Sequence, residues 1–156
     1  SNHLEGLARV MAQVAGERRH LIEVHGPGLA KCWERLDQLR QRHGLHLVAC
    51  EGPEVVGWGE VMPETAEARR HVGVLSFGLA ARLRGHGFGR LLLNTTVRQA
   101  FLTTNLARLE LEVLGADEIS RHLIEHQGFR EEGCKVGGWR LDGRSDDILI
   151  YALGRK

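Results

Sequence analysis

The stretch that decides the fold reads Arg84-Gly85-His86-Gly87-Phe88-Gly89-Arg90, and it stands between an apolar strand-like run and an amphipathic helix. Glycines at alternate positions remove every second side chain and allow backbone conformations with positive φ, so consecutive amide N–H groups can turn toward one anion. The following helix adds its free N–H groups and the positive end of its dipole at the same place. The pattern predicts a ligand that carries a diphosphate.

Two common phosphate-binding loops do not fit this stretch. A dinucleotide fingerprint that begins at Gly85 requires a third glycine at position 90, which is Arg90, and no acidic residue follows about 20 residues later in a second parallel strand pattern. A P-loop ends in Gly-Lys-Ser/Thr, whereas this loop ends in Gly89-Arg90-Leu91. Two interpretations stay open: another kind of anion loop, and a tight strand-to-helix connection that binds nothing.

Length and composition narrow the class of protein. The chain has 156 residues, which is the size of a single domain with one hydrophobic core, so we expect one domain over residues 1–156. Its 21 Lys and Arg against 20 Asp and Glu, with 5% aromatic residues, argue against nucleic acid or an anionic membrane as the partner. Three cysteines without paired or metal-type spacing, and the lack of a long apolar or signal-like stretch, predict a cytoplasmic protein with free thiols.

Hydrophobic periodicity before the loop predicts two helices and then antiparallel strands. Apolar residues recur at three- and four-residue steps in the first 43 residues and then form short runs, two of which flank the turn signal Glu51-Gly52-Pro53. The predicted elements are helices over 4–19 and between Pro27 and Gly44, and strands over 45–50, 54–62 and 71–79.

After the loop the pattern changes to helix, strand, helix and two closing strands. Leu109, Leu111 and Val113 alternate with charged residues, as in a strand with one buried face. Asp117 is suited to cap a helix that Gly128 ends. The predicted elements are a helix over 93–101, a strand over 107–114, a helix over 117–127, and strands over 133–141 and 146–153.

Together these elements predict an α+β domain with a mixed, mostly antiparallel sheet and helices on both faces. The connection between residues 79 and 107 is long enough to hold a crossover helix, so the two strands that it joins are expected to be parallel neighbours. We expect this pair to splay apart and to leave a crevice beside the helix N-terminus.

Two blocks of residues resemble the motifs of a known family. Arg84, Gly87 and Gly89 are spaced as Arg/Gln-x-x-Gly-x-Gly/Ala. The second block comprises Leu111-Glu112-Val113, Asp117 where the family often has Asn, Leu123, Glu125 and Gly128-Phe129. Residues 141–149 are also similar to the closing hairpin of many bacterial members. Over residues 45–153 the chain therefore resembles the GNAT superfamily of acyl-CoA-dependent N-acyltransferases.

This resemblance implies acetyl-CoA as the co-substrate and no metal. The main chain of Leu79, Ala80 and Ala81 would bind the pantetheine arm, and an N–H there would polarise the thioester carbonyl. Asp117 and Arg121 would lie near the other side of the coenzyme. The loop amides would hold the coenzyme A pyrophosphate, with added charge from the two arginines, and the residues of this cradle are Arg84, Gly85, His86, Gly87, Phe88, Gly89 and Arg90.

Direct transfer of an acetyl group to an amine also requires a base, because a charged ammonium has no lone pair to attack with. Glu112 matches the position of the base in some ribosomal-protein acetyltransferases that this segment resembles. A water chain is the alternative to a protein base. Glu112 is equally well interpreted as an exposed strand carboxylate that pairs with Arg108 or with a cross-strand cation.

The chain departs from the family pattern at three places. The frequent tyrosine acid is replaced by Ile124, and the only tyrosine is Tyr151, on the last strand. The carboxylate that histone-type members carry before the loop is replaced by Gly73. The usual first strand is missing, since helical periodicity begins at Leu4, so an edge of the sheet is expected to be exposed or paired with a second copy. Secondary candidates for catalysis are Glu60, His71 and Ser76.

The sequence thus predicts an N-acetyltransferase that acts directly on a primary amine of a small molecule, an amino acid, a peptide or a protein. The alternative is a catalytically weak acyl-CoA-binding or regulatory module that keeps the cradle but not the acid. A more distant alternative is a protein that binds a nucleotide phosphate.

Overall fold

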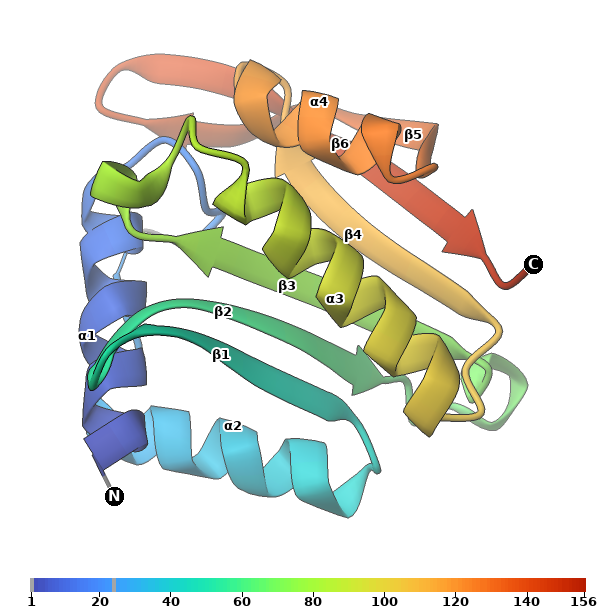
Figure 1. Cartoon of the computed structure of the whole chain (residues 1–156). Coiled ribbons are helices and arrows are strands. Elements are labelled where there is room, and N and C mark those ends of the chain that lie inside the picture. Colours follow the sequence, from blue (N-terminus) through green and yellow to red (C-terminus); the bar gives the residue numbers. More distant parts are fainter. Residues whose placement is uncertain (1, 24) are drawn as a thin grey trace.

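The computed structural model describes residues 2–23 and 25–156. Its described part forms a sheet in the order β1-β2-β3-β4-β6-β5, with α-helices on both sides (Figure 1). The helices are α1 (Asn2–Gly16), α2 (Leu29–Gln41), α3 (Phe88–Thr103) and α4 (Glu118–His126). The strands are β1 (Leu45–Glu51), β2 (Glu54–Pro63), β3 (Val72–Leu79), β4 (Arg108–Leu114), β5 (Arg130–Leu141) and β6 (Arg144–Gly154). The predicted α+β class and the order of the elements are confirmed.

Strands β3 and β4 are the parallel pair of an otherwise antiparallel sheet. Their pairing covers only Val72–Val74 against Arg108–Glu110, although both strands continue well beyond it. On its other side β3 pairs with β2 as far as Leu79. The two strands therefore splay apart toward their carboxyl ends, as the sequence predicted, and the N-terminus of α3 lies at that end of β3 (Figure 1).

The sheet buries apolar side chains on both faces, because helices cover both of them. Leu109, Leu111 and Val113 of β4 pack with residues of α3 and α4 in one cluster. Trp58 of β2 packs in a separate cluster with residues of α1 and α2. Helices α1 and α2 contact β1 and β2 much more than β4. The face of β3 and β4 opposite α3 is therefore left for the cleft described below.

Two glycines of the loop have conformations that other residues rarely adopt. Gly85 has a φ of 80° and Gly87, the residue before α3, has a φ of 85°. Both lie in the left-handed region, which glycine reaches without steric cost. Gly128 has a φ of 105° directly after α4, which confirms its predicted place at the end of that helix.

The end of the first helix differs from the prediction. The periodicity predicts a helix to Arg19, but α1 ends at Gly16 and Arg18 has a positive φ of 58°. The reason is tertiary, since the side chains of Glu17, Arg18 and His20 form ion pairs with distant parts of the chain. The last helix–strand connection is also shorter than predicted, with β5 beginning at Arg130 rather than at position 133. None of the helices in the described part is long and apolar enough to cross a membrane.

Candidate active site

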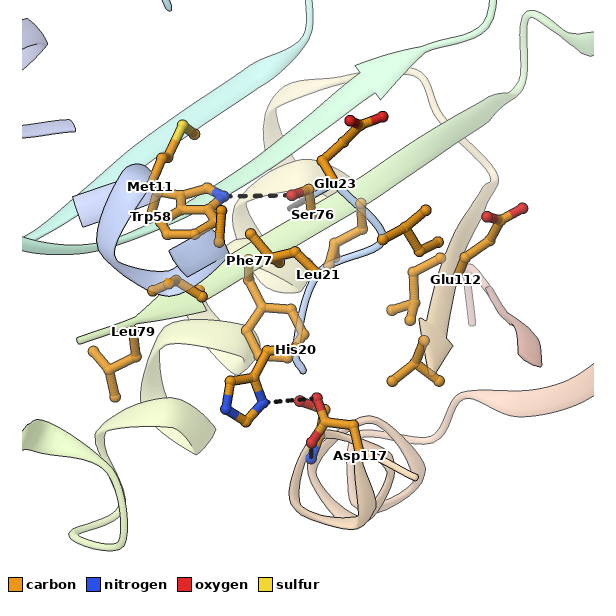
Figure 2. Close-up of a pocket in the computed structure, with 18 of the residues that line it drawn as sticks. Met11, His20, Leu21, Glu23, Trp58, Ser76, Phe77, Leu79, Glu112 and Asp117 are labelled. Carbon is orange, nitrogen blue, oxygen red and sulfur yellow. Dashed lines mark hydrogen bonds and ion pairs between the residues drawn. The ribbon is translucent and has the colours of Figure 1, made fainter. Parts of the chain in front are cut away.

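A cleft of about 2000 Å³ opens where β3 and β4 separate. Its lining comes from both strands, from the glycine loop, from the first turns of α4, from α2 and from the connection between α1 and α2. Figure 2 shows part of this cleft, with Trp58 and Ser76 on one side and Glu112 projecting from β4. Segments that are far apart in the sequence therefore contribute to one site.

The glycine loop forms one end of the cleft. Gly85, Gly87, Gly89 and Arg90 line it. Within the described residues, no group accepts a hydrogen bond from the amide N–H groups of residues 85–90. The first bonded amide of this region belongs to Leu91, which donates to the Gly87 carbonyl at 3.1 Å. A run of free N–H groups at a helix N-terminus is suited to an anion. His86 and Phe88 are exposed here, with ring centroids 6.3 Å apart.

The carboxyl end of β3 presents main-chain groups to the splayed side. Ala80 donates its N–H to the Val56 carbonyl of β2 at 2.7 Å. Successive residues of a strand point their polar groups to opposite edges, so those of Phe77 and Leu79 point toward the splay. The expectation for Ala80 is thus corrected, because its amide is already used within the sheet. Phe77, rather than Ala80, has its main-chain groups on the splayed side and lines the cleft, and the alternation of strand edges could have identified it from the sequence.

Ala81 and Arg84 connect β3 to the loop. Ala81 begins a short turn of 3₁₀ helix, and its carbonyl accepts the Arg84 N–H at 3.1 Å. The Arg84 guanidinium turns back from the loop: it donates to the Leu79 carbonyl at 2.9 and 3.1 Å and to the carboxylate of Glu17 at 2.6 and 2.7 Å. Its charge is thus balanced within the protein. Arg90, by contrast, is exposed and has no carboxylate within ion-pair distance among the described residues.

Asp117 forms the opposite wall as the N-cap of α4. Its side chain accepts from the Ser120 N–H at 3.2 Å, which confirms the predicted cap, and its other oxygen lies 3.2 Å from His20 Nδ1 (Figure 2). Burial raises the pKa of Asp117, but the hydrogen bonds from His20 and Ser120 outweigh it and hold the pKa below its usual value. At neutral pH Asp117 is therefore an anion held in place by its neighbours.

Arg121 does not lie where the sequence placed it. Its guanidinium donates to the Gly115 carbonyl at 3.1 Å, in the connection between β4 and α4. The residues through which α4 lines the cleft include Ser120, His122 and Ile124. Arg121 is absent from a lining to which residues 117–120 and 122–124 contribute, because its guanidinium is held at the Gly115 carbonyl.

Glu112 reaches the cleft from the solvent-facing side of β4. It is about one-third exposed, with 37% of its side chain accessible, and its Oε1 lies 2.8 Å from Lys135 Nζ of β5. The interpretation as a carboxylate paired with a cross-strand cation is therefore confirmed, and the cation is Lys135 of β5, which lies beyond β6 in the sheet. Arg108 instead pairs with Glu110 and Glu132. Glu112 can line the cleft and form this ion pair at the same time. Its role as the general base stays a prediction.

The position of the missing tyrosine holds a core residue. Ile124 is fully buried in the cluster beneath α4. Tyr151 is 1% exposed and donates its O–H to Glu125 Oε1 at 2.7 Å, and burial with this hydrogen bond raises its pKa. Tyr151 is thus fixed inside the domain and does not line the cleft. Of the secondary candidates, Ser76 does line it and accepts from Trp58 Nε1 at 3.3 Å.

Glu60 lies behind the cleft wall rather than in it. It is 1% exposed and pairs with Arg35 of α2, and His46 Nδ1 lies 3.5 Å from its Oε2. Burial raises its pKa, but His46 and Arg35 together hold it below the usual value. Because its carboxylate is ionised and enclosed, Glu60 supports the wall and keeps Arg35 in place. His71 is exposed just before β3, where its carbonyl accepts from Ala107 and Arg108.

Two residues that line the cleft carry no signal in the sequence. Glu17 was assigned to the helix over 4–19 and His20 follows it directly, and nothing in their spacing indicates contacts with residues 64 or more positions away. In addition, no group of three or more His, Cys, Asp and Glu in the described part is arranged to hold a metal ion.

Comparison with known proteins places these features in a family. The model of the GNAT acetyltransferase family matches residues 14–129, which is most of the chain. Spermidine N(1)-acetyltransferase of Vibrio cholerae is 34% identical over 79 residues, which cover 50% of this chain and 46% of that protein. The chain thus spans about half the length of this curated relative.

Solved structures show the same fold. Ribosomal-protein-alanine N-acetyltransferase from Brucella melitensis superposes with a TM-score of 0.89 at 24% identity, over 99% of this chain and 96% of that one. An acetyltransferase from Salmonella typhimurium, solved with its cofactor acetyl-CoA, gives a TM-score of 0.89 at 14% identity, over 99% and 90%. The family model, the fold and the loop agree, and the chain belongs to the GNAT acetyltransferase family.

Proposed function

We propose that this protein transfers the acetyl group of acetyl-CoA directly to a primary amine. The observation that carries the proposal is the run of unpaired amides at residues 85–90, at the N-terminus of α3 and beside two splayed parallel strands. The fold relative from Salmonella typhimurium was solved with acetyl-CoA, which supports the same co-substrate here.

In this proposal the main chain binds most of the coenzyme. The amides of residues 85–90 hold the pyrophosphate, and the edge of β3 away from β2 binds the pantetheine arm through the main chain of Phe77 and the N–H of Leu79, whose carbonyl is bound by Arg84. Acetyl-CoA supplies an activated acetyl group, and an N–H of this edge stabilises the negative charge that develops on its carbonyl oxygen. Because the strand is held by β2 along its other edge, the donor is already oriented before the ligand arrives.

Glu112 is the base of this proposal. It accepts a proton from the amine, either directly or through water, so that the nitrogen lone pair can attack. The ion pair with Lys135 keeps the Glu112 carboxylate in one orientation at the edge of the cleft. Because the position of the family's tyrosine holds the apolar Ile124, the thiolate in this proposal leaves without a tyrosine acid and takes its proton from water.

The acceptor proposed here is a small amine with a positive charge. The half of the cleft away from the glycine loop contains Glu23, Glu34 and Glu64, none of which has a cation partner among the described residues. Its cations Arg35 and Arg69 are paired with Glu60 and Glu110, which leaves Lys31 as the opposing charge. The relative named for spermidine acetylation supports this class of acceptor.

The test is release of free thiol from acetyl-CoA with a panel of amines, alongside calorimetric titration with CoA. We expect binding of CoA and turnover with at least one polyamine or other small cationic amine. Lack of CoA binding at millimolar concentration would refute the proposal. Binding without turnover on any amine would favour the second candidate, a regulatory acyl-CoA-binding module, which the burial of Tyr151 and the presence of Ile124 support.

A further inference from the structure

The ion pair between Glu17 and Arg84 is not used by the mechanism above. Both carboxylate oxygens take part: Oε1 accepts from Arg84 Nη1 at 2.7 Å and Oε2 accepts from Nη2 at 2.6 Å. Such a bidentate pair has the geometry with which a guanidinium also binds a phosphate. Both side chains are mostly buried, with exposures of 29% for Glu17 and 23% for Arg84. Arg84 is the first residue of the glycine loop.

Glu17 is held beside that loop by a short segment, residues 17–20, which we call the strap. Arg18 pairs with Asp142 at 2.8 Å, and its carbonyl accepts from Arg144 at 3.2 Å. His20 lies 3.2 Å from Asp117 of α4. The strap therefore runs from the glycine loop to α4 and to the β5–β6 turn, across one end of the cleft, and Glu17 lines the same cleft as the amides of Gly85 and Gly87.

The charges around Glu17 fix its ionisation. The hydrogen bonds from Arg84 lower the pKa of Glu17, and the neighbouring charges of Arg84, His20 and Arg19 act in the same direction. His20 Nε2 lies 3.1 Å from Arg84 Nη1 and 3.6 Å from Glu17 Oε1, while its Nδ1 faces the buried carboxylate of Asp117. Glu17 is therefore a permanent anion at neutral pH, next to amides suited to another anion.

We propose that Glu17 is an internal counter-anion of the coenzyme site, which balances Arg84 in the empty protein and lowers the affinity for the coenzyme phosphates. This inference rests on the proposed function, since it takes coenzyme A as the ligand of the loop. An arriving diphosphate meets a neutralised Arg84 and a negative carboxylate beside it. The same carboxylate favours departure of the product CoA, because the ion pair within the protein re-forms as the phosphates leave.

The proposal is tested with the variant Glu17→Gln, which keeps the shape of the side chain and removes its charge. Calorimetry measures the dissociation constants of CoA and of pantetheine, which lacks the phosphates. For CoA we expect binding about fivefold tighter than in the unchanged protein, as for the removal of one like charge at a few ångströms. For pantetheine we expect no change.

The matched control is Glu132→Gln, which also removes one carboxylate charge from an ion pair with an arginine, Arg108, but lies outside the cleft lining. It should leave both dissociation constants unchanged. Unchanged or weaker CoA binding by Glu17→Gln would overturn the proposal, and so would equal tightening for CoA and pantetheine, since that would be an effect of shape. Whether the unchanged protein binds CoA at all tests the proposed function. The role of Glu17 is tested separately, by the ratio of the CoA dissociation constants of the unchanged protein and of Glu17→Gln.

Discussion

The two halves of the cleft are built from different parts of the chain. The coenzyme half consists of consecutive backbone groups, the amides of residues 85–90 and the edge of β3. The acceptor half consists of side chains from β4, α2 and the α1–α2 connection. Backbone sites depend on local conformation, which glycine spacing reveals, whereas side-chain sites depend on which distant segments meet. CoA binding in the first half should therefore be lost when the backbone conformation changes. Catalysis in the second half should be lost when a single functional group is removed.

The largest effect is expected in the acceptor half, at Glu112. Glu112→Gln should lower kcat by about a hundredfold, the lower end of the contribution of a general base, while the dissociation constant of CoA stays the same. Steady-state kinetics and CoA titration check this. The matched control is Glu110→Gln on the same face of β4, where Arg69 and Arg108 already bind the carboxylate. Equal losses in both variants, or an unchanged rate for Glu112→Gln across the pH range, would exclude Glu112 as the base.

The next effect concerns the backbone of the coenzyme half. Gly87→Val places a β-branched residue at a φ of 85°, which costs about 1–2 kcal/mol and turns the loop amides away from their common target. CoA binding should weaken by at least about tenfold, since about 1.4 kcal/mol corresponds to a factor of ten. Gly52→Val is the control, because Gly52 also has a positive φ, of 58°, but lies in the β1–β2 turn. If both variants lose stability and neither loses CoA binding, the loop does not hold the coenzyme.

A smaller effect is expected at the wall that both halves share. The pKa of Asp117 is lowered in the folded protein, so its contribution to stability is complete above the unfolded value of 3.8 and is lost as the pH falls through the folded value. Asp117→Asn keeps an N-cap but loses the charge opposite His20. We expect a loss of about 1.5 kcal/mol at pH 7, the lower end of the range for a hydrogen bond to a charged group.

The measurement is urea unfolding of both proteins at pH 7 and at pH 3. The difference in unfolding free energy between them should shrink at pH 3, because Asp117 of the unfolded chain, with its ordinary pKa of 3.8, has by then taken up a proton, which favours the unfolded state of the unchanged protein. A difference that stays constant between the two pH values would mean that the charge of Asp117 does not stabilise the fold.

The difference between the two halves of the cleft also explains which parts of the fold and of the site could be predicted from the sequence. The strands, the helices after Pro27 and the splayed parallel pair were predictable, because hydrophobic period and turn residues are local signals. The loop was predictable from three glycines, and two of them have the positive φ that the spacing suggested. The Asp117 cap was predictable for the same reason.

Other parts of the site depended on contacts that no local pattern encodes. Residues 17–19 of the strap were predicted as helix, since no local pattern indicates the ion pairs that join Glu17 to Arg84 and Arg18 to Asp142, across 67 and 124 positions. Arg121 was placed toward the coenzyme by its position in a motif, but its partner is the carbonyl of Gly115. Ala80 was grouped with Leu79 although adjacent residues of a strand face opposite edges.

The central claim is that the amides of the glycine loop bind the coenzyme pyrophosphate. The most direct test is the change in the ¹H–¹⁵N resonances of Gly85, Gly87 and Gly89 during titration with CoA and, separately, with pantetheine. The account predicts that these three amides shift strongly with CoA and little with pantetheine. Shifts of the same size with both ligands, or shifts with CoA that leave these three glycines unchanged, would contradict it.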